Sequence, residues 1–302
     1  MKIFMTGVTG YIGGSVALAL RSAGHDVHGL VRSEERAAEA RSHGFVPIMG
    51  GLDDAGVLTS ATQDADLVIH TAHADHAPSA HALLAALEGS GKRLIHTSGS
   101  SIVGTQAGGE FLAPVYDEAT PFTPSPGRAP RVALNKDILG AKGLHPVIIA
   151  PSLIYGLGHI GHRHSMQVPW LVETARRKGV PSHLGPGENV WSHVHIDDVV
   201  KLFLLAIEKA PAGALYYAEN GEASMKSLCQ SIGRAMGKGE ATQAMTLEEA
   251  AAEWGEGPAM NTMGSNSRVR SVRARDELGW SPQGTSVTDE IERGCYLEFI
   301  RA

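Results

Sequence analysis

Cysteine is scarce in this sequence, whose 302 residues include only Cys229 and Cys295. The two cysteines lie far apart and form neither a CxxC pair nor the spacing of a zinc-binding motif. A fold that depends on disulfide bonds is therefore not expected, which is typical of proteins from a reducing compartment. We predict a cytoplasmic location.

Long apolar runs and an excess of basic residues are also missing. No stretch reaches about 18 uninterrupted apolar residues, so the sequence predicts no membrane-spanning helix. Met1 and Lys2 lead directly into an expected strand rather than into a signal peptide. The formal net charge is −6, whereas proteins that bind nucleic acid or anionic membranes need a basic face. We expect neither of these partners and predict a small-molecule substrate.

What is present resembles an ordinary globular enzyme, with 43% hydrophobic and 19% charged residues. In the first half of the chain, short apolar runs alternate with stretches rich in Ala and Leu. This alternation predicts a parallel sheet with crossover helices. Strands are expected at Lys2–Thr6, Asp26–Val31, Val46–Met49, Leu67–His70, Arg93–Thr97 and Val147–Ala150. Helices are expected at Tyr11–Ala23, Glu34–His43, Asp54–Ala61, Ala77–Glu88 and Val132–Lys142, with Ser33 and Asp53 as N-caps.

The fold class predicted is α/β, a Rossmann-type doubly wound parallel sheet with a smaller C-terminal α/β substrate lobe. Residues 1–155 form the dinucleotide-binding domain and residues 156–302 mainly the substrate-binding lobe, with residues 190–217 returning to the Rossmann core. Gly104–Arg131 lacks periodicity and is expected to be a functional or mobile loop. In the second half we expect strands at Val190–His195 and Leu215–Tyr217, and helices at Met166–Lys178, Asp198–Lys209, Met225–Met236, Leu247–Trp254 and Val287–Ile300.

A glycine-rich turn follows the first expected strand and opens the first helix. It reads Gly7-Val8-Thr9-Gly10-Tyr11-Ile12-Gly13, a GxxGxxG spacing. Glycine at these positions permits a tight turn and close approach of the backbone to a pyrophosphate, which the helix N-terminus then attracts. Gly7, Thr9, Gly10, Tyr11, Ile12 and Gly13 are therefore predicted to bind a nicotinamide dinucleotide.

The end of the second strand favours NADP over NAD. An acidic residue there would accept a hydrogen bond from the NAD ribose, but this chain has Arg32 and Ser33. A guanidinium can pair with the 2′-phosphate and stack on adenine, and the serine adds a donor. Asp26 begins this strand instead of ending it. The alternative is that Arg32 is only a solvated charge, which would leave NAD as the cofactor.

With these residues in view, the chain resembles the extended and atypical branches of the short-chain dehydrogenase/reductase superfamily, whose members include NAD-dependent epimerases and dehydratases. Besides the glycine loop, the resemblance rests on four segments in the expected order. These are Asp117-Glu118-Ala119-Thr120-Pro121, Pro151-Ser152-Leu153-Ile154-Tyr155-Gly156, His193–Val199 and Glu277-Leu278-Gly279-Trp280-Ser281-Pro282.

The resemblance implies further cofactor contacts. Asp53 looks like the family's adenine-contacting acid, and Thr71 and Ala72 like the segment beside the adenosine. Pro151 and Ile154 belong to the loop that packs on the nicotinamide. We also predict cofactor contacts for His73 and Thr97.

The catalytic pair of this family is missing. Its chemistry uses a Tyr with a Lys four residues later, which lowers the pKa of the phenol, and a nearby Ser or Thr. None of the six tyrosines has Lys at that position. If Asp137 is aligned with the family's usual acid, Ala129 and Ala133 occupy the Tyr and Lys positions, and Gly99 the Ser position.

Other residues must then supply the proton and polarise the substrate. Tyr155, beside the presumed nicotinamide, is the first candidate proton donor, and Tyr116 on the long loop is the second. Ser98, Ser100 and Ser101 are candidates to orient a substrate oxygen, and Arg131 to polarise a carbonyl or bind an anion. Each of these also has a purely structural interpretation.

The sequence contains 15 histidines, but their spacing does not favour a metal. Among their clusters, only His159, His162 and His164 have a workable spacing for zinc, and we predict no metal. Substrate contacts are expected instead from His164, Met166, Trp170, Trp191 and His193. Trp170, at helical spacing from Met166, is equally compatible with a core position.

Taken together, the sequence predicts an NADP-dependent oxidoreductase that reduces a small carbonyl or enone compound with an atypical active site. Two alternatives stay open: a redox sensor or scaffold that binds NADP without catalysis, and a nucleotide-sugar epimerase or dehydratase with Arg268 and Arg270 at the diphosphate. The family resemblance also implies a homodimer formed through the helices Ala77–Glu88 and Val132–Lys142.

Overall fold

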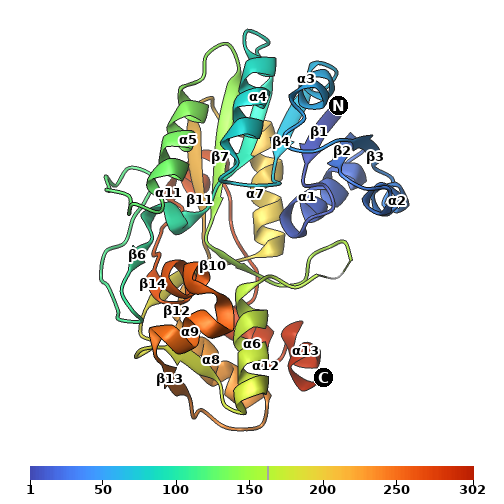
Figure 1. Ribbon diagram of the computed structural model, residues 1–302. Helices are drawn as coiled ribbons and strands as arrows, with labels where there is room; N and C mark the ends of the chain where they lie inside the picture. Colours follow the sequence, from blue (N-terminus) through green and yellow to red (C-terminus); the bar gives the residue numbers. More distant parts are fainter. Residues whose placement is uncertain (162) are drawn as a thin grey trace.

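The computed structural model describes residues 1–161 and 163–302, and a seven-stranded parallel sheet forms its centre (Figure 1). The strand order is β11-β7-β5-β4-β1-β2-β3. The chain builds outward from β1 to β3 and then returns to add β4 on the other side of β1. This reversal makes the β1/β4 junction a topological switch point, where open α/β sheets bind ligands. The prediction of a doubly wound α/β fold is confirmed. The strands are β1 (Lys2–Thr6), β2 (Asp26–Val31), β3 (Val46–Met49), β4 (Leu67–His70), β5 (Arg93–Thr97), β7 (His145–Pro151) and β11 (Ala214–Ala218).

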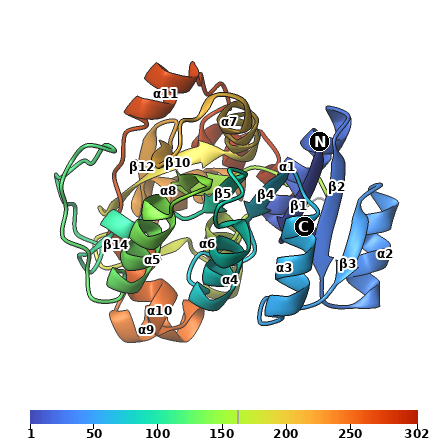
Figure 2. The ribbon, with the colours of Figure 1, turned by 90° about the horizontal axis from the view of Figure 1, so that it is seen from above.

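Helices cover both faces of this sheet, because both faces of its strands carry apolar side chains. Ile3 and Met5 of β1 lie in one core cluster with residues of the first set of helices, whereas Phe4 lies in a second cluster with the others. In Figure 2, α7 and α11 lie on one side of the sheet and α3, α4 and α5 on the other. The first set is α1 (Tyr11–Ser22), α2 (Glu34–Ser42), α7 (Ile196–Lys209) and α11 (Val272–Leu278); the second is α3 (Ala55–Gln63), α4 (Ala77–Leu87) and α5 (Ala129–Gly140).

A second lobe lies beneath the carboxyl ends of the strands in the view of Figure 1. It has its own apolar core, which includes Trp191, Trp254 and Tyr296. Its strands form small sheets: β8 (Leu153–Tyr155), β10 (Val190–His195) and β12 (Glu222–Ser224); β9 (Ser182–Leu184) with β13 (Gln243–Met245); and β6 (Thr105–Gln106) with β14 (Ser265–Asn266). Its helices are α6 (Gln167–Lys178), α8 (Met225–Ala235), α9 (Leu247–Trp254), α10 (Glu256–Pro258), α12 (Val287–Glu292) and α13 (Tyr296–Arg301).

Three local predictions are wrong. The helix expected at Val287–Ile300 is broken into α12 and α13, because the Glu290 carboxylate accepts a hydrogen bond from the Cys295 backbone at 2.8 Å. Helix α5 begins at Ala129 rather than Val132, since Pro130 suits a first helical turn. Asp54 rather than Asp53 caps α3, and its carboxylate accepts a hydrogen bond from the Val57 backbone at 3.1 Å.

The predicted division at residue 155 stays a prediction. Within the range 190–217, α7 packs on the central sheet and β11 is one of its edge strands, whereas β10 pairs with β8 in the second lobe. Helices α4 and α5 lie side by side, and His81 and Asp137 bridge them at 3.2 Å. Among the described residues, every helix is too short or too polar to cross a membrane.

Candidate active site

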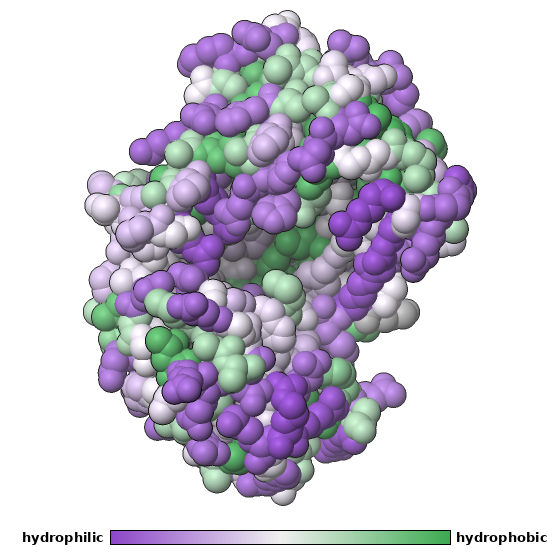
Figure 3. Space-filling model, viewed as in Figure 1, coloured by the Kyte–Doolittle hydropathy of each residue, from purple (hydrophilic) through white to green (hydrophobic). Residues whose placement is uncertain are grey.

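A cavity of about 720 Å³ lies between the two lobes at the carboxyl end of the central sheet. Figure 3 shows the molecule hollowed at this level, with apolar side chains at the bottom of the hollow. A volume of this size suits a small molecule or part of a cofactor. The central sheet contributes the loops after β1, β4, β5 and β7, namely Gly7, Gly10–Gly13, Thr71, Ala72, Ser98–Ser101 and Pro151–Ile154.

The glycine loop forms a close-fitting cradle at one end of this cavity. Gly7 has φ +76°, and a Cβ there would lie 2.8 Å from Thr71 Oγ1. A Cβ on Gly13 would lie 2.2 Å from the Gly7 carbonyl oxygen. Gly10 caps α1 without a side-chain hydrogen bond, so the first backbone N–H groups of the helix are available to a ligand. This arrangement fits a pyrophosphate, which binds to backbone N–H groups at a helix N-terminus.

Four residues predicted to contact the cofactor, Arg32, Ser33, Asp53 and His73, lie outside the cavity lining. Arg32 is exposed at the end of β2, and Ser33 caps α2 by accepting a hydrogen bond from the Arg36 backbone at 3.3 Å. Asp53 pairs with His76 at 3.2 Å. His73 Nδ1 accepts a hydrogen bond from the Asp75 backbone at 3.1 Å. Contact of these side chains with a cofactor stays a prediction.

Three further residues predicted to bind the cofactor lie on or near the loops after β1, β4 and β5. Thr71 Oγ1 donates to the Thr6 carbonyl at 2.7 Å, which links β4 to β1 at the switch point. The Thr9 carbonyl accepts a hydrogen bond from Arg163. Thr97 is buried, and its hydroxyl has no hydrogen-bond partner among the described residues.

Both predicted tyrosine proton donors are misplaced for that role, so these predictions are corrected. Tyr155 is fully buried in the core of the second lobe, and its hydroxyl donates to the Thr285 carbonyl at 2.6 Å. Burial raises its pKa far above the ordinary range, as do the nearby carboxylates of Asp198 and Glu290. Tyr116 packs against Phe122, and neither tyrosine lines the cavity. Pairing of β8 with β10 makes Tyr155 part of a sheet of the second lobe, and its ring lies on the face that is buried in the core of that lobe.

Substitution of Tyr155 tests this correction. Tyr155→Phe is expected to leave catalytic activity unchanged and to lower the free energy of unfolding by about 1 kcal/mol, the usual net value of one hydrogen bond. Urea denaturation would measure the stability, and initial rates the activity. A folded Tyr155→Phe protein without activity would return this residue to the catalytic site.

A polar group at the cavity is assembled from the segment after β5, the loop before α4 and helix α5. Arg131 donates to Ser101 Oγ at 2.9 Å, and its Nε donates to Asp75 at 2.6 Å. This hydrogen bond holds the pKa of the Asp75 carboxyl below its usual range. Ser98 lines the cavity and accepts a hydrogen bond from Asn135 Nδ2 at 2.9 Å. Ser98, Ser101 and Arg131 therefore present donors to the same space.

Arg131 and Asn135 reproduce the four-residue spacing of the missing Tyr and Lys on one face of α5. A Cβ added at Gly99 would lie 3.4 Å from Arg131 Nη1, so the missing side chain leaves room for the guanidinium. Asn135 was not predicted from the sequence, although its spacing from Arg131 could have indicated it. Ser100 lines the cavity, but its hydroxyl is engaged with Ser267 at 2.9 Å.

The second lobe supplies the opposite wall. His164, Met166, Trp170 and Trp191 line the cavity, and Trp191 Nε1 donates to the Ser265 carbonyl at 2.8 Å. Their contact with a substrate stays a prediction. Six further residues of this wall were missed, because no motif marks them: Ser165, Gln167, Gly257, Pro258, Asn261 and Thr262.

Two buried histidines on different strands have lowered pKa values. His193 does not line the cavity, which corrects its prediction as a substrate contact. It is buried, and burial lowers its pKa to about 4. His70 is also buried, with its pKa lowered to about 4, and shares a hydrogen bond of 2.6 Å with Thr6 Oγ1.

His162, part of the histidine cluster considered for zinc, lies outside the described residues. Within those residues, no group of three His, Cys, Asp or Glu side chains is arranged to hold a metal.

The chain matches the model of a known protein family and is similar to several known proteins. The model of the NAD dependent epimerase/dehydratase family matches residues 3–217. An oxidase, ucsJ, of Acremonium sp is 30% identical, over 96% of this chain and 95% of its own length. A 4-hydroxy-2-methyl-3-oxo-4-farnesyl-3,4-dihydroquinoline-1-oxide ketoreductase of Stigmatella aurantiaca is 28% identical, over 73% of this chain and 69% of its own. The crystal structure of UDP-glucose 4-epimerase from Thermotoga maritima has a TM-score of 0.77 at 18% identity and covers 99% of this chain and 98% of that one.

Proposed function

The chain belongs to the NAD dependent epimerase/dehydratase family, and on this premise we propose that it is an NADP-dependent reductase of a small carbonyl or enone compound. One observation carries the proposal: hydrogen-bond donors of Ser98, Ser101 and Arg131 converge on a cavity that also contains the glycine cradle. The similarity to a ketoreductase and to an oxidase supports redox chemistry.

The proposed mechanism assigns separate tasks to the residues of the cavity. Bound NADPH would supply the hydride. Arg131 stabilises the negative charge that develops on the substrate oxygen, since preformed donors and charges aimed at such an oxygen are effective in a water-poor site. Asn135 donates to Ser98 Oγ, which leaves the Ser98 proton free for the substrate oxygen. The product oxygen then takes its proton through Ser98, which is replenished by water.

Three large apolar side chains lie on the substrate side of the cavity. Trp170, Trp191 and Met166 favour a hydrophobic or aromatic compound over a free sugar. The neighbouring Gln167 and Asn261 provide polar contacts that would orient it.

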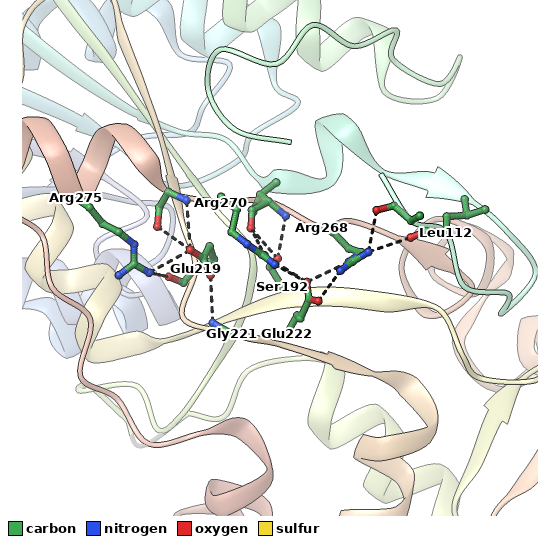
Figure 4. A network of polar contacts seen from close by, with 11 residues as sticks. Leu112, Ser192, Glu219, Gly221, Glu222, Arg268, Arg270 and Arg275 are labelled. Atoms are coloured by element: carbon green, nitrogen blue, oxygen red, sulfur yellow. Dashed lines mark hydrogen bonds and ion pairs between the residues drawn. The ribbon is translucent and has the colours of Figure 1, made fainter. Parts of the chain in front are cut away.

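The epimerase alternative is less well supported. Arg268 and Arg270, the candidate diphosphate contacts, both pair with Glu222, at 2.6 Å and 3.3 Å (Figure 4). Arg275 is held in the same network by Glu219 at 3.1 Å. Arg268 and Arg270 fasten the segment after β14 to β12, and Arg275 fastens α11 to the residue after β11. None of these arginines lines the cavity.

Cofactor binding tests the proposal. We expect Arg32→Asp to weaken NADPH binding by about 10- to 100-fold and to leave NADH binding nearly unchanged, because charge-assisted hydrogen bonds to the 2′-phosphate are lost. Fluorescence titration of both reduced cofactors measures this. The matched control is Arg41→Asp, which makes the same charge change near the other end of α2, where Arg41 pairs with Glu34 at 2.6 Å.

The outcomes separate the alternatives. Equal affinity of the wild type for NADPH and NADH, unaffected by Arg32→Asp, would contradict NADP as the cofactor and return NAD to first place. Tight NADPH binding without oxidation across a panel of carbonyl and enone compounds would favour the redox sensor.

A further inference from the structure

One arginine of the second lobe reaches back to the cofactor loop. Arg163 lies between β8 and α6, yet its guanidinium donates to the Thr9 carbonyl in the glycine loop. It also pairs with Glu39 of α2 at 2.5 Å. The other oxygen of Glu39 pairs with Arg36 at 2.7 Å. Arg163 thus bridges the β1–α1 loop and helix α2.

The segment that carries Arg163 is seated firmly on helix α1. The His159 backbone donates to Ser15 Oγ at 3.1 Å. Ile160 is buried against Gly14, where an added Cβ would lie 2.2 Å from Ile160 Cδ1. The Tyr11 hydroxyl donates to the Gly156 carbonyl at 3.0 Å. These contacts hold the backbone that precedes Arg163 against helix α1, next to the glycine loop.

The position of this guanidinium suits the 2′-phosphate of NADP. Strands β1 and β2 are hydrogen-bonded in parallel, with Thr6 beside Leu30, so Thr9 and Arg32 both follow the same edge of the sheet. Arg36 and Arg163 share one carboxylate, Glu39. Arg32 is exposed and lies four positions before Arg36, just ahead of α2. Arg32, Arg36 and Arg163 thus bring three guanidinium cations toward the carboxylate of Glu39, while Glu34 of the same helix pairs with Arg41. Guanidinium groups bind phosphate through charge-assisted hydrogen bonds.

We propose that Arg163 binds the 2′-phosphate of NADP together with Arg32, and that the phosphate takes the place of Glu39 on its guanidinium. This inference rests on the proposed function, because it requires NADP as the cofactor. Arg163 is followed directly by His164, Ser165 and Met166, which line the substrate side of the cavity. The same contact therefore connects recognition of the cofactor phosphate to the position of the substrate wall.

The test compares two adenosine ligands that differ in the 2′-phosphate. Adenosine 2′,5′-bisphosphate and adenosine 5′-monophosphate are titrated by calorimetry into the full-length wild type and Arg163→Met. We expect Arg163→Met to weaken the bisphosphate by about tenfold and to leave the monophosphate unchanged, and Arg163→Lys to recover part of the loss, because the charge is retained without the guanidinium fork. Arg41→Met, which removes a cation from α2 outside this group, is expected to change neither ligand.

Each outcome has a distinct meaning. If Arg163→Met lowers the affinity for both ligands equally, or for neither, the inference is overturned. The proposal of NADP as cofactor still stands in that case if the wild type prefers the bisphosphate and this preference depends on Arg32. If the wild type itself binds both ligands equally, the proposed cofactor and this inference fail together. Thermal melting of Arg163→Met and Arg163→Lys shows whether each variant folds. If Arg163→Met does not fold, the same two titrations with folded Arg163→Lys provide the test.

Discussion

Replacement of Arg131 by methionine is expected to lower kcat for carbonyl reduction by about 100-fold or more, a loss typical of removing one oxyanion-stabilising donor. Methionine keeps much of the length of the side chain but cannot carry the charge that the proposed mechanism places beside the substrate oxygen. The affinity for NADPH should stay the same, since Arg131 contacts Ser101 and Asp75 rather than the glycine loop. Steady-state kinetics on a substrate from the carbonyl and enone panel, together with NADPH titration, would measure both effects.

Lys136→Met provides the matched control for Arg131→Met. Lys136 is exposed on the same helix α5, so its substitution removes one cation at a site without contact to the cavity. Asp75, which would lose its partner in Arg131→Met, keeps 46% of its side chain accessible to water, and the variant is therefore expected to fold. An unchanged kcat in folded Arg131→Met would exclude Arg131 from catalysis.

Substitution of Gly13 by alanine is expected to weaken NADPH binding by about tenfold or more, the loss of at least one hydrogen bond to a charged group. The new Cβ would lie 2.2 Å from the Gly7 carbonyl oxygen and 2.3 Å from Thr71 Oγ1. Relief of this overlap must displace the loop that cradles the pyrophosphate. We also expect the melting temperature to fall by a few degrees, since overpacking costs about 1–3 kcal/mol.

Gly140→Ala shows what an alanine does where space is available. A Cβ at Gly140 meets no heavy atom within 4 Å, and the residue lies at the end of α5. This variant should keep full NADPH affinity and equal or slightly higher stability, because alanine favours the helical conformation. If Gly13→Ala bound NADPH as tightly as Gly140→Ala, the glycine loop would not be the cofactor cradle.

Predictions that depend on local sequence were the most accurate. The strands of the central sheet agree with the structure to within a few residues, because each is a short apolar run bounded by turn residues. The glycine loop was recognised because its spacing and its place between a strand and a helix depend only on adjacent residues. The short strands β8, β9 and β12 were missed, since three residues carry no measurable periodicity.

Predictions that depend on where a side chain points were less accurate. Tyr155 was placed beside the nicotinamide from its position after β7, but pairing of β8 with β10 turns the ring into the core of the second lobe. Asn135 was missed, because its partner Ser98 lies 37 positions away along the chain. Sequence distance hides such contacts even when each helix and strand is predicted correctly.

The sequence by itself determined the doubly wound α/β fold, the family and the place of the glycine loop, since each follows from patterns of neighbouring residues. Only the tertiary structure decided which polar groups share the cavity. The convergence of Ser98 and Arg131, and the reach of Arg163 to Glu39, join segments more than 30 and 120 positions apart. Packing of α5 on the central sheet brings Ser98 and Arg131 together, and packing of the segment after β8 on α1 brings Arg163 to Glu39. Such packing reflects the sum of many weak apolar contacts that no single motif records.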